Sequence, residues 1–235
     1  MTPLIEARGI RIAHRLKPID LSFQPGEMVA VVGPNGGGKT SLLRALAQVE
    51  DVEGDVLIGG ETLAGLAPSR RARLVGLLPA SRDMAWPICV RDVISLGGAG
   101  HSPNAVDEQL EAFELQAFAD RRVDRLSTGE RSRALLARIF AASPRLMLLD
   151  EPMANLDPYW VRRLLVLLRN RVGSEGSVGL VALHDLGQMA RFDRVIAVRN
   201  GLVAFDGTPQ MLLESEIFLE VFRIPAEALG LTSTR

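Results

Sequence analysis

The sequence predicts an α/β fold with a parallel sheet, and three observations support this prediction. A short apolar run, Met28–Val32, is followed by a glycine-rich turn and then by helical apolar spacing over Ser41–Ala47. Two further apolar runs, Leu146–Leu149 and Gly179–Leu183, flank the amphipathic segment Trp160–Arg171. Strand, helix and strand in this order are typical of parallel strands joined by helices. With 235 residues, of which 47% are hydrophobic, the chain is long enough for one large domain.

The remaining segments fill in the rest of the fold. Short strands are expected over residues 4–61, with turns at Pro25-Gly26 and Gly59-Gly60. The strand signal is lost between about Pro79 and Ser143, where helices are expected instead. Asn200-Gly201 lies between two apolar runs and predicts a type I′ hairpin.

The glycine-rich turn after the first buried strand matches a phosphate-binding pattern. It reads Gly33-Pro34-Asn35-Gly36-Gly37-Gly38-Lys39-Thr40, which is G-x-x-x-x-G-K-[ST] in the strand-to-helix context that the pattern requires. Backbone N–H groups of such a loop turn toward phosphate oxygens, and the following helix dipole favours an anion. We expect the segment from Gly33 to Ser41 to bind a nucleotide, with Lys39 between the β- and γ-phosphates and Thr40 as a Mg²⁺ ligand. The alternative is a glycine-rich turn without a chemical role.

Two carboxylates follow the apolar run Leu146–Leu149. The carboxyl ends of parallel strands form the edge at which α/β sheets bind ligands, so Asp150 and Glu151 are expected there. Asp150 suits a Mg²⁺ site, and Glu151 is placed to act as general base on the attacking water. In the alternative interpretation, Asp-Glu-Pro only ends a strand before a turn.

Ser127 and Glu130 form an S-x-x-E pattern before an apolar helical stretch, which by itself predicts a capping box at a helix start. The longer motif Leu126-Ser127-Thr128-Gly129-Glu130 also resembles the LSGGQ signature of ATP-binding-cassette (ABC) ATPases. Asn155-Leu156-Asp157 is similar to the D-loop of that family, and His184 to its switch histidine. The order and spacing of these motifs match the family from near Leu4 to Leu213.

The resemblance implies a P-loop NTPase (RecA-like) core with an N-terminal antiparallel β-subdomain and an inserted α-helical subdomain. The whole chain, 1–235, would be one ABC ATPase domain, with 1–79 and 144–235 as core and β-subdomain and 80–143 as the helical signature subdomain. ATP and Mg²⁺ are the implied cofactors. Two copies would dock head to tail, so that Ser127 and Gly129 approach the γ-phosphate held by the partner copy. His184 would contact the γ-phosphate, and Glu151, His184 and Lys39 would be the catalytic residues.

Three positions depart from the family pattern. The family usually has a Gln where this chain has Ala80, and that Gln helps to ligate Mg²⁺ and couples the helical subdomain to the core. We therefore expect weaker Mg²⁺ coordination and retained ATP binding, with the Ser81 hydroxyl as a shorter substitute. An aromatic residue usually stacks on adenine, but here Ile12, His14 or a neighbouring arginine would have to do so. Thr128 and Glu130 replace Gly and Gln of the signature.

Within the family, we expect the chain to be the ATPase subunit of an importer. No apolar run approaches the roughly 18 residues of a membrane helix and no signal-peptide pattern is present, so we expect a cytoplasmic chain, peripheral to the membrane through permease subunits. A substrate-binding protein would be an indirect partner. The stretch Trp86–Gly97 followed by His101 is similar to cassettes for iron–siderophore, haem and cobalamin uptake, and Gly207–Leu213 agrees with importer cassettes in general.

Two other function classes stay open. One is a non-transport ABC protein acting on ribosomes or DNA; the net charge of −1 gives no reason to expect nucleic acid binding. The other is a regulatory nucleotide-binding module with weak hydrolysis, suggested by Ala80. Among the remaining conspicuous residues, Trp86, Trp160 and Cys89 are predicted to be buried packing residues, and His101 a solvent-facing loop residue.

Overall fold

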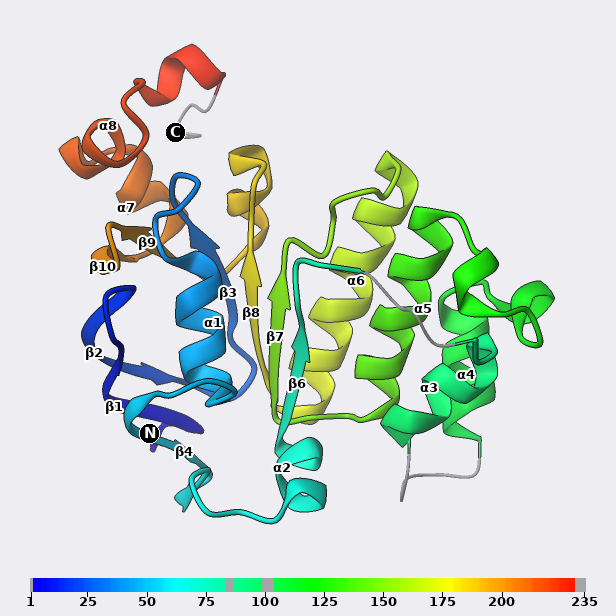
Figure 1. The fold of residues 1–235 in the computed structure, drawn as a ribbon. Helices are drawn as coiled ribbons and strands as arrows, with labels where there is room; N and C mark the ends of the chain where they lie inside the picture. Colours follow the sequence, from blue (N-terminus) through cyan, green and yellow to red (C-terminus); the bar gives the residue numbers. More distant parts are fainter. Residues whose placement is uncertain (1, 83–86, 99–103, 231–235) are drawn as a thin grey trace.

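The computed structural model describes residues 2–82, 87–98 and 104–230, and it contains two sheets with helices around them (Figure 1). The strands of the larger sheet run in the order β10-β9-β3-β8-β7-β6. Neighbouring strands from β9 to β6 are parallel, and β10 pairs antiparallel with β9. The strands of this sheet are β3 (Met28–Val32), β6 (Val75–Leu78), β7 (Leu146–Asp150), β8 (Val178–Ala182), β9 (Arg194–Arg199) and β10 (Leu202–Gly207).

The smaller sheet is antiparallel and comes from the N-terminal part of the chain. Its strands follow the order β2-β1-β4-β5. The bounds are β1 (Ile5–Ile12), β2 (Leu16–Phe23), β4 (Glu53–Ile58) and β5 (Glu61–Thr62). The parallel sheet and this antiparallel sheet confirm the predicted fold class. The division of the chain at residues 79 and 144 stays a prediction.

Helix α1 (Lys39–Ala47) lies between the two sheets, and the other long helices lie on the opposite face of the larger sheet (Figure 1). The helices on that face and in the inserted segment are α3 (Val90–Gly98), α4 (Ala105–Ala112), α5 (Thr128–Ala141) and α6 (Pro158–Glu175). Shorter helices are α2 (Pro68–Leu74), α7 (Pro209–Leu213) and α8 (Glu216–Phe222), and the 3₁₀ helices are η1 (Gln116–Phe118), η2 (Val123–Arg125), η3 (Leu186–Arg191) and η4 (Ala226–Leu229).

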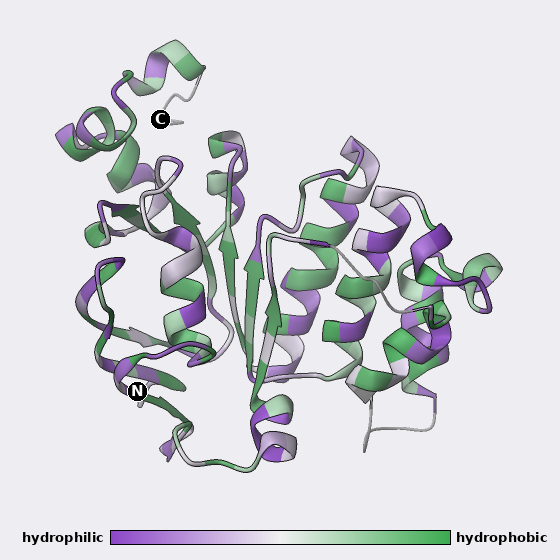
Figure 2. Ribbon diagram, in the orientation of Figure 1, coloured by the Kyte–Doolittle hydropathy of each residue, from purple (hydrophilic) through white to green (hydrophobic). Residues whose placement is uncertain are grey.

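Two hydrophobic cores cover the two faces of the larger sheet. Because side chains alternate along a strand, Val29 and Val31 of β3 face α1 and the small sheet, whereas Met28 and Ala30 face α5 and α6. The central strands β3, β7 and β8 are buried along their whole length and almost entirely apolar, and the surrounding helices carry one apolar and one polar side (Figure 2). Burial on both faces explains why the parallel strands are continuous apolar runs in the sequence.

Local predictions agree with these elements. The β9–β10 connection has both central residues in the left-handed region, with φ of 52° at Asn200 and 72° at Gly201, as a type I′ turn requires. Trp160 is 8% exposed and its ring stacks on Phe113 at a centroid distance of 6.5 Å, which confirms its packing role. No helix in the described ranges is long and apolar enough to cross a bilayer.

The prediction for Cys89 was wrong. Its side chain is half-buried, and its thiol donates a hydrogen bond to Asp92 Oδ2 at 2.9 Å, next to the start of α3. Burial is the main cause that raises the pKa of the Cys89 thiol, with the Asp92 hydrogen bond adding to it. Trp86 and His101 lie outside the described residues.

Candidate active site

The phosphate-binding loop connects the end of β3 to the start of α1 and packs against the β9–β10 hairpin. Gly33 has φ of 147°, and a Cβ atom there would lie 2.1 Å from the carbonyl oxygen of Val198. The Gly201 N–H donates a hydrogen bond to the Gly37 carbonyl at 2.9 Å. Only glycine allows this close approach of two backbones. The hairpin therefore helps to hold the loop in shape, which the sequence did not indicate.

The first turn of α1 is free to meet an anion. Its N-cap is Gly38, no side chain in the described part of the protein caps the helix, and its first turn contains no acidic residue. Unpaired N–H groups and the positive end of the helix dipole favour a negatively charged ligand there. This agrees with the role predicted for the loop.

Lys39 lies folded over the loop. Its Nζ donates hydrogen bonds to the carbonyl oxygens of Gly33 at 2.9 Å and Pro34 at 3.3 Å, and the residue is only 7% exposed. Burial lowers the pKa of Lys39, and the nearby charges of Glu151 and Asp150 oppose that shift. An ammonium held by two neutral carbonyls can exchange them for phosphate oxygens, which are stronger acceptors.

Asp150 ends β7 beside the loop and is 2% exposed. Burial is the main cause that raises its pKa, and the neighbouring Thr40 hydroxyl and the charges of Arg82 and Lys39 act in the opposite direction. Its Oδ1 atom is buried with no hydrogen-bond partner among the described residues. An orphaned, buried carboxylate oxygen next to a hydroxyl is a donor set that suits Mg²⁺. The residues present therefore fit the predicted metal.

Glu151 follows Asp150 and lines two cavities at once. One, of about 580 Å³, is the cavity of the phosphate-binding loop, where Lys39 and Thr40 also lie. The other, of about 710 Å³, lies between the start of α6 and η3 and includes His184. The backbone of Glu151 is left-handed, with φ of 48°. Non-glycine residues adopt this conformation rarely, and such strain is concentrated at functional sites.

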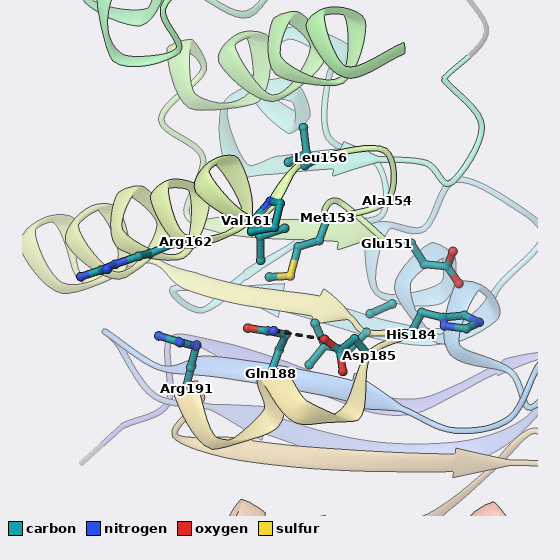
Figure 3. Close-up of a pocket in the computed structure, with 13 residues that line it drawn as sticks. Glu151, Met153, Ala154, Leu156, Val161, Arg162, His184, Asp185, Gln188 and Arg191 are labelled. Atoms are coloured by element: carbon teal, nitrogen blue, oxygen red, sulfur yellow. Dashed lines mark hydrogen bonds between the residues drawn. The ribbon is translucent and has the colours of Figure 1, made fainter. Parts of the chain in front are cut away.

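His184 follows β8 and is exposed. Figure 3 shows the side chains of Glu151 and His184 at one end of the larger cavity, and Arg162 and Arg191 at the other end. Asp185 caps η3 through the Gly187 N–H at 2.9 Å and also accepts a hydrogen bond from Gln188. The structure thus places His184 next to the predicted general base.

The signature residues lie elsewhere. Ser127 is the N-cap of α5 and accepts a hydrogen bond from the Glu130 N–H at 3.2 Å, while the Glu130 carboxylate accepts one from the Ser127 N–H at 2.8 Å. The predicted capping box is therefore confirmed. Ser127 and Gly129 line a third cavity, of about 220 Å³, with Asn155 and Asp157. This cavity shares none of its lining residues with the phosphate-loop cavity.

The four residues that could contact the adenine ring are Ile12, His14 and the neighbouring Arg11 and Arg15, and they lie in two different places. Ile12 is 4% exposed and belongs to the core between the sheets, and Arg11 pairs with Glu53 at the edge of the small sheet. His14 and Arg15 line the phosphate-loop cavity. Of these four residues, His14 and Arg15 are the ones that lie beside the space for a bound nucleotide. Their contact with adenine stays a prediction.

Arg82 is a residue of this site that sequence reasoning missed. Ala80 and Ser81 are exposed, whereas Arg82 is 7% exposed and its Nη2 donates to the carbonyl oxygens of Asp150 at 2.9 Å and Glu151 at 3.1 Å. No local pattern marks an arginine of this kind, because its partners lie 68 and 69 positions away along the chain.

Known proteins resemble this chain in sequence over most of its length. Residues 16–154 match the sequence profile of the family described as "ABC transporter". A hemin import ATP-binding protein from Nocardia farcinica is 34% identical over 244 residues, covering 96% of this chain and 84% of that protein. A cobalamin import ATP-binding protein from Halobacterium salinarum is 33% identical, covering 93% of this chain and 56% of that protein.

A solved structure shares the fold. It is a dimeric ATP-binding cassette bound to ADP and Pi in a post-hydrolysis state, with a TM-score of 0.75, 21% sequence identity and coverage of 87% of this chain and 98% of that one. The profile and the relatives agree on the family, and the solved structure agrees on the fold. The chain therefore belongs to the ABC transporter family, as one of its ATPase cassettes.

Proposed function

We propose that this chain is the nucleotide-binding subunit of an ABC importer and that it hydrolyses ATP in a dimer that ATP itself brings together. The observation that carries the proposal is that Lys39, Thr40 and Glu151 line one cavity of about 580 Å³. A phosphate anchor, a hydroxyl ligand and a carboxylate base in one space are the groups that phosphoryl transfer to water requires.

The chain's own residues divide the work in this cavity. Lys39 and the N–H groups at the start of α1 hold the phosphates and neutralise part of their charge. Glu151 orients the attacking water and accepts its proton. His184 contacts the γ-phosphate from the end of β8. Thr40 and Asp150 would hold Mg²⁺, which when bound supplies positive charge next to the phosphate oxygens.

The second copy is needed because the signature residues line a separate cavity. Ser127 and Gly129 lie at the N-terminus of α5, a helix of 14 residues whose first N–H groups favour an anion. In a head-to-tail dimer they would approach the γ-phosphate bound by the other copy. Each phosphate-binding loop is then completed by the partner's α5, so that hydrolysis and dimerisation depend on each other.

The importer assignment rests on relatives that are named hemin and cobalamin import ATP-binding proteins. We infer a cargo of the haem, iron–siderophore or cobalamin class, permease subunits as the membrane partners, and a location at the cytoplasmic face of the membrane. A substrate-binding protein would deliver the cargo to the permease. Neighbouring genes that encode a permease and a binding protein would support this inference, and their absence together with genes of translation would favour the ribosome-acting alternative.

The experiment that tests the proposal compares the wild type with Glu151→Gln. We expect the variant to lose ATP turnover by roughly 100-fold or more, because the amide cannot accept the proton of water. It should also elute as a dimer in gel filtration with ATP and as a monomer without ATP. Glu175→Gln is the control, since Glu175 pairs with Arg171 at the far end of α6 and lies outside the cavity.

Two results would contradict the proposal. A wild type as slow as Glu151→Gln would favour the regulatory module with weak hydrolysis. A Glu151→Gln variant that stays monomeric in ATP would rule out dimerisation driven by ATP.

A further inference from the structure

Arg82 lies at the point where the chain leaves the larger sheet for the helical segment 80–143. Strand β6 pairs in parallel with β7, with Leu78 opposite Leu149, so the chain leaves β6 beside Asp150. Four positions after Leu78, the side chain of Arg82 turns back into the protein and is 7% exposed. An arginine at the start of one segment is thus packed against the end of a strand in another.

The contacts of Arg82 are with the backbone that carries the two carboxylates. Its Nη2 donates to the Asp150 carbonyl at 2.9 Å and to the Glu151 carbonyl at 3.1 Å. The Glu151 carbonyl also accepts a hydrogen bond from the Ala154 N–H at 3.1 Å, and the Glu151 N–H donates to Ala182 at 3.2 Å. Because Glu151 has a strained φ of 48°, its conformation depends on such external contacts.

Burial of this guanidinium is costly for the fold. Its Nε and Nη1 atoms are buried and have no hydrogen-bond partner within the described residues. Buried N–H groups without partners destabilise a protein, and a buried charge does so more strongly. Burial lowers the pKa of Arg82, and the charges of Asp150 and Glu151 oppose that shift. A costly group held beside a strained catalytic segment indicates a functional role rather than a packing role.

We propose that Arg82 is a positioning residue that sets the backbone of Glu151 and ties it to the start of the helical segment. A shift of that segment would then move the Glu151 carboxylate relative to the phosphates. The methyl group of Ala80 cannot link the helical segment to the backbone of Glu151. Arg82, two positions later in the chain, makes this link instead. This inference rests on the proposed function, in which Glu151 is the general base.

The test measures steady-state ATP hydrolysis by the full chain with Arg82→Ala and Arg82→Lys. Displacing a base by about 1 Å costs up to about 100-fold in rate, so we expect Arg82→Ala to lower kcat by about 10- to 100-fold. The KM for ATP should change by less than about threefold, because Lys39 and the loop are untouched. Arg82→Lys keeps the positive charge and a group that can donate to a carbonyl, so it should recover part of kcat.

Arg71→Ala is the matched control. The Arg71 guanidinium also donates to two backbone carbonyls, those of Ala47 and Gln48, but at the end of α1 remote from the phosphate-binding loop. We expect this variant to be less stable and to keep its kcat. A loss of kcat that merely follows stability would appear in Arg71→Ala as well.

Each outcome decides the inference. Unchanged kcat in Arg82→Ala, or an increase in KM with kcat unchanged, would overturn the role of Arg82 and leave the proposed function intact. Wild-type turnover no faster than Glu151→Gln would instead overturn the proposed function. If Arg82→Ala does not fold, Arg82→Lys and Arg82→Gln decide in the same way, since wild-type kcat in both would exclude a positioning role.

Discussion

The Thr40 hydroxyl lies beside the Asp150 carboxylate and acts to lower its pKa, so the first turn of α1 meets the end of β7 at this pair of residues. The Asp150 carboxylate is almost completely buried at this junction, and its Oδ1 atom makes no hydrogen bond within the described residues. Asp150 is therefore a group that destabilises the nucleotide-free protein and is suited to a metal ion. The carboxylate that suits a metal ion thus lowers the stability of the nucleotide-free protein, and substitution of Asp150 can measure this effect.

We predict that Asp150→Asn stabilises the nucleotide-free protein at neutral pH and abolishes Mg²⁺-dependent hydrolysis. The raised pKa of Asp150 means that the folded state binds more protons than the unfolded state between pH 3.8 and that raised pKa. Stability of the wild type therefore falls as the pH rises through this window. The gain from Asn should be about 1–3 kcal/mol above the window, and it should disappear near pH 3.8, the ordinary value.

Calorimetric melting of both proteins across this pH range checks the prediction. The control is Asp55→Asn, at an exposed position on β4, which should change the melting temperature little at any pH. A variant Asp150→Asn that melts below the wild type at neutral pH would show that the carboxylate is better satisfied than its contacts indicate.

Ala80→Gln should change the Mg²⁺ dependence of the enzyme. Ala80 is exposed two positions after the end of β6, so a longer side chain can be accommodated there without disturbing the core. An added amide oxygen would give Mg²⁺ a further ligand, and we expect half-maximal hydrolysis at a Mg²⁺ concentration lower by about tenfold. A titration of ATPase activity with Mg²⁺ measures this. Equal curves and equal turnover in the two proteins would show that Ala80 does not weaken the metal site.

Mixing Lys39→Ala with Ser127→Ala should restore hydrolysis that neither variant shows alone. Lys39 and Ser127 line separate cavities, and in a head-to-tail dimer one intact site forms from the Lys39 of one copy and the Ser127 of the other. The mixture is compared with Lys39→Ala plus the double variant Lys39→Ala/Ser127→Ala, which can form no intact site. Equal activity in the two mixtures would contradict the shared site.

His14→Ala should weaken ATP binding and leave inorganic triphosphate binding unchanged. His14 lines the phosphate-loop cavity, and stacking of a base on a ring contributes about 1–3 kcal/mol, so Kd should rise about fivefold or more. His14→Phe should bind ATP at least as tightly as the wild type. Arg11→Ala is the control because Arg11 pairs with Glu53 at the sheet edge. If Arg15→Ala raises Kd and His14→Ala does not, Arg15 is the base contact instead.

Much of the fold was predictable because its signals are local. A buried parallel strand needs apolar residues on both faces, and β3, β7 and β8 were found from that requirement alone. The capping box at Ser127 and the hairpin at Asn200-Gly201 depend on residues at most three positions apart. The burial of Cys89 was predicted wrongly, because the burial of a side chain depends on neighbours from other segments of the chain. In the structure its thiol reaches Asp92 at a partly open helix start.

The sequence by itself determined the family and the fold class, and it predicted a phosphate anchor at Lys39, a metal ligand at Asp150, a base at Glu151 and a signature at Ser127. These identities follow from short motifs whose residues are close together along the chain. Only the tertiary structure decided that Glu151 borders both the loop cavity and the cavity of His184, that Ser127 borders neither, and that Arg82 reaches the Asp150 and Glu151 carbonyls. Such contacts join strands and loops distant in sequence, and their distances depend on how the sheet and helices pack.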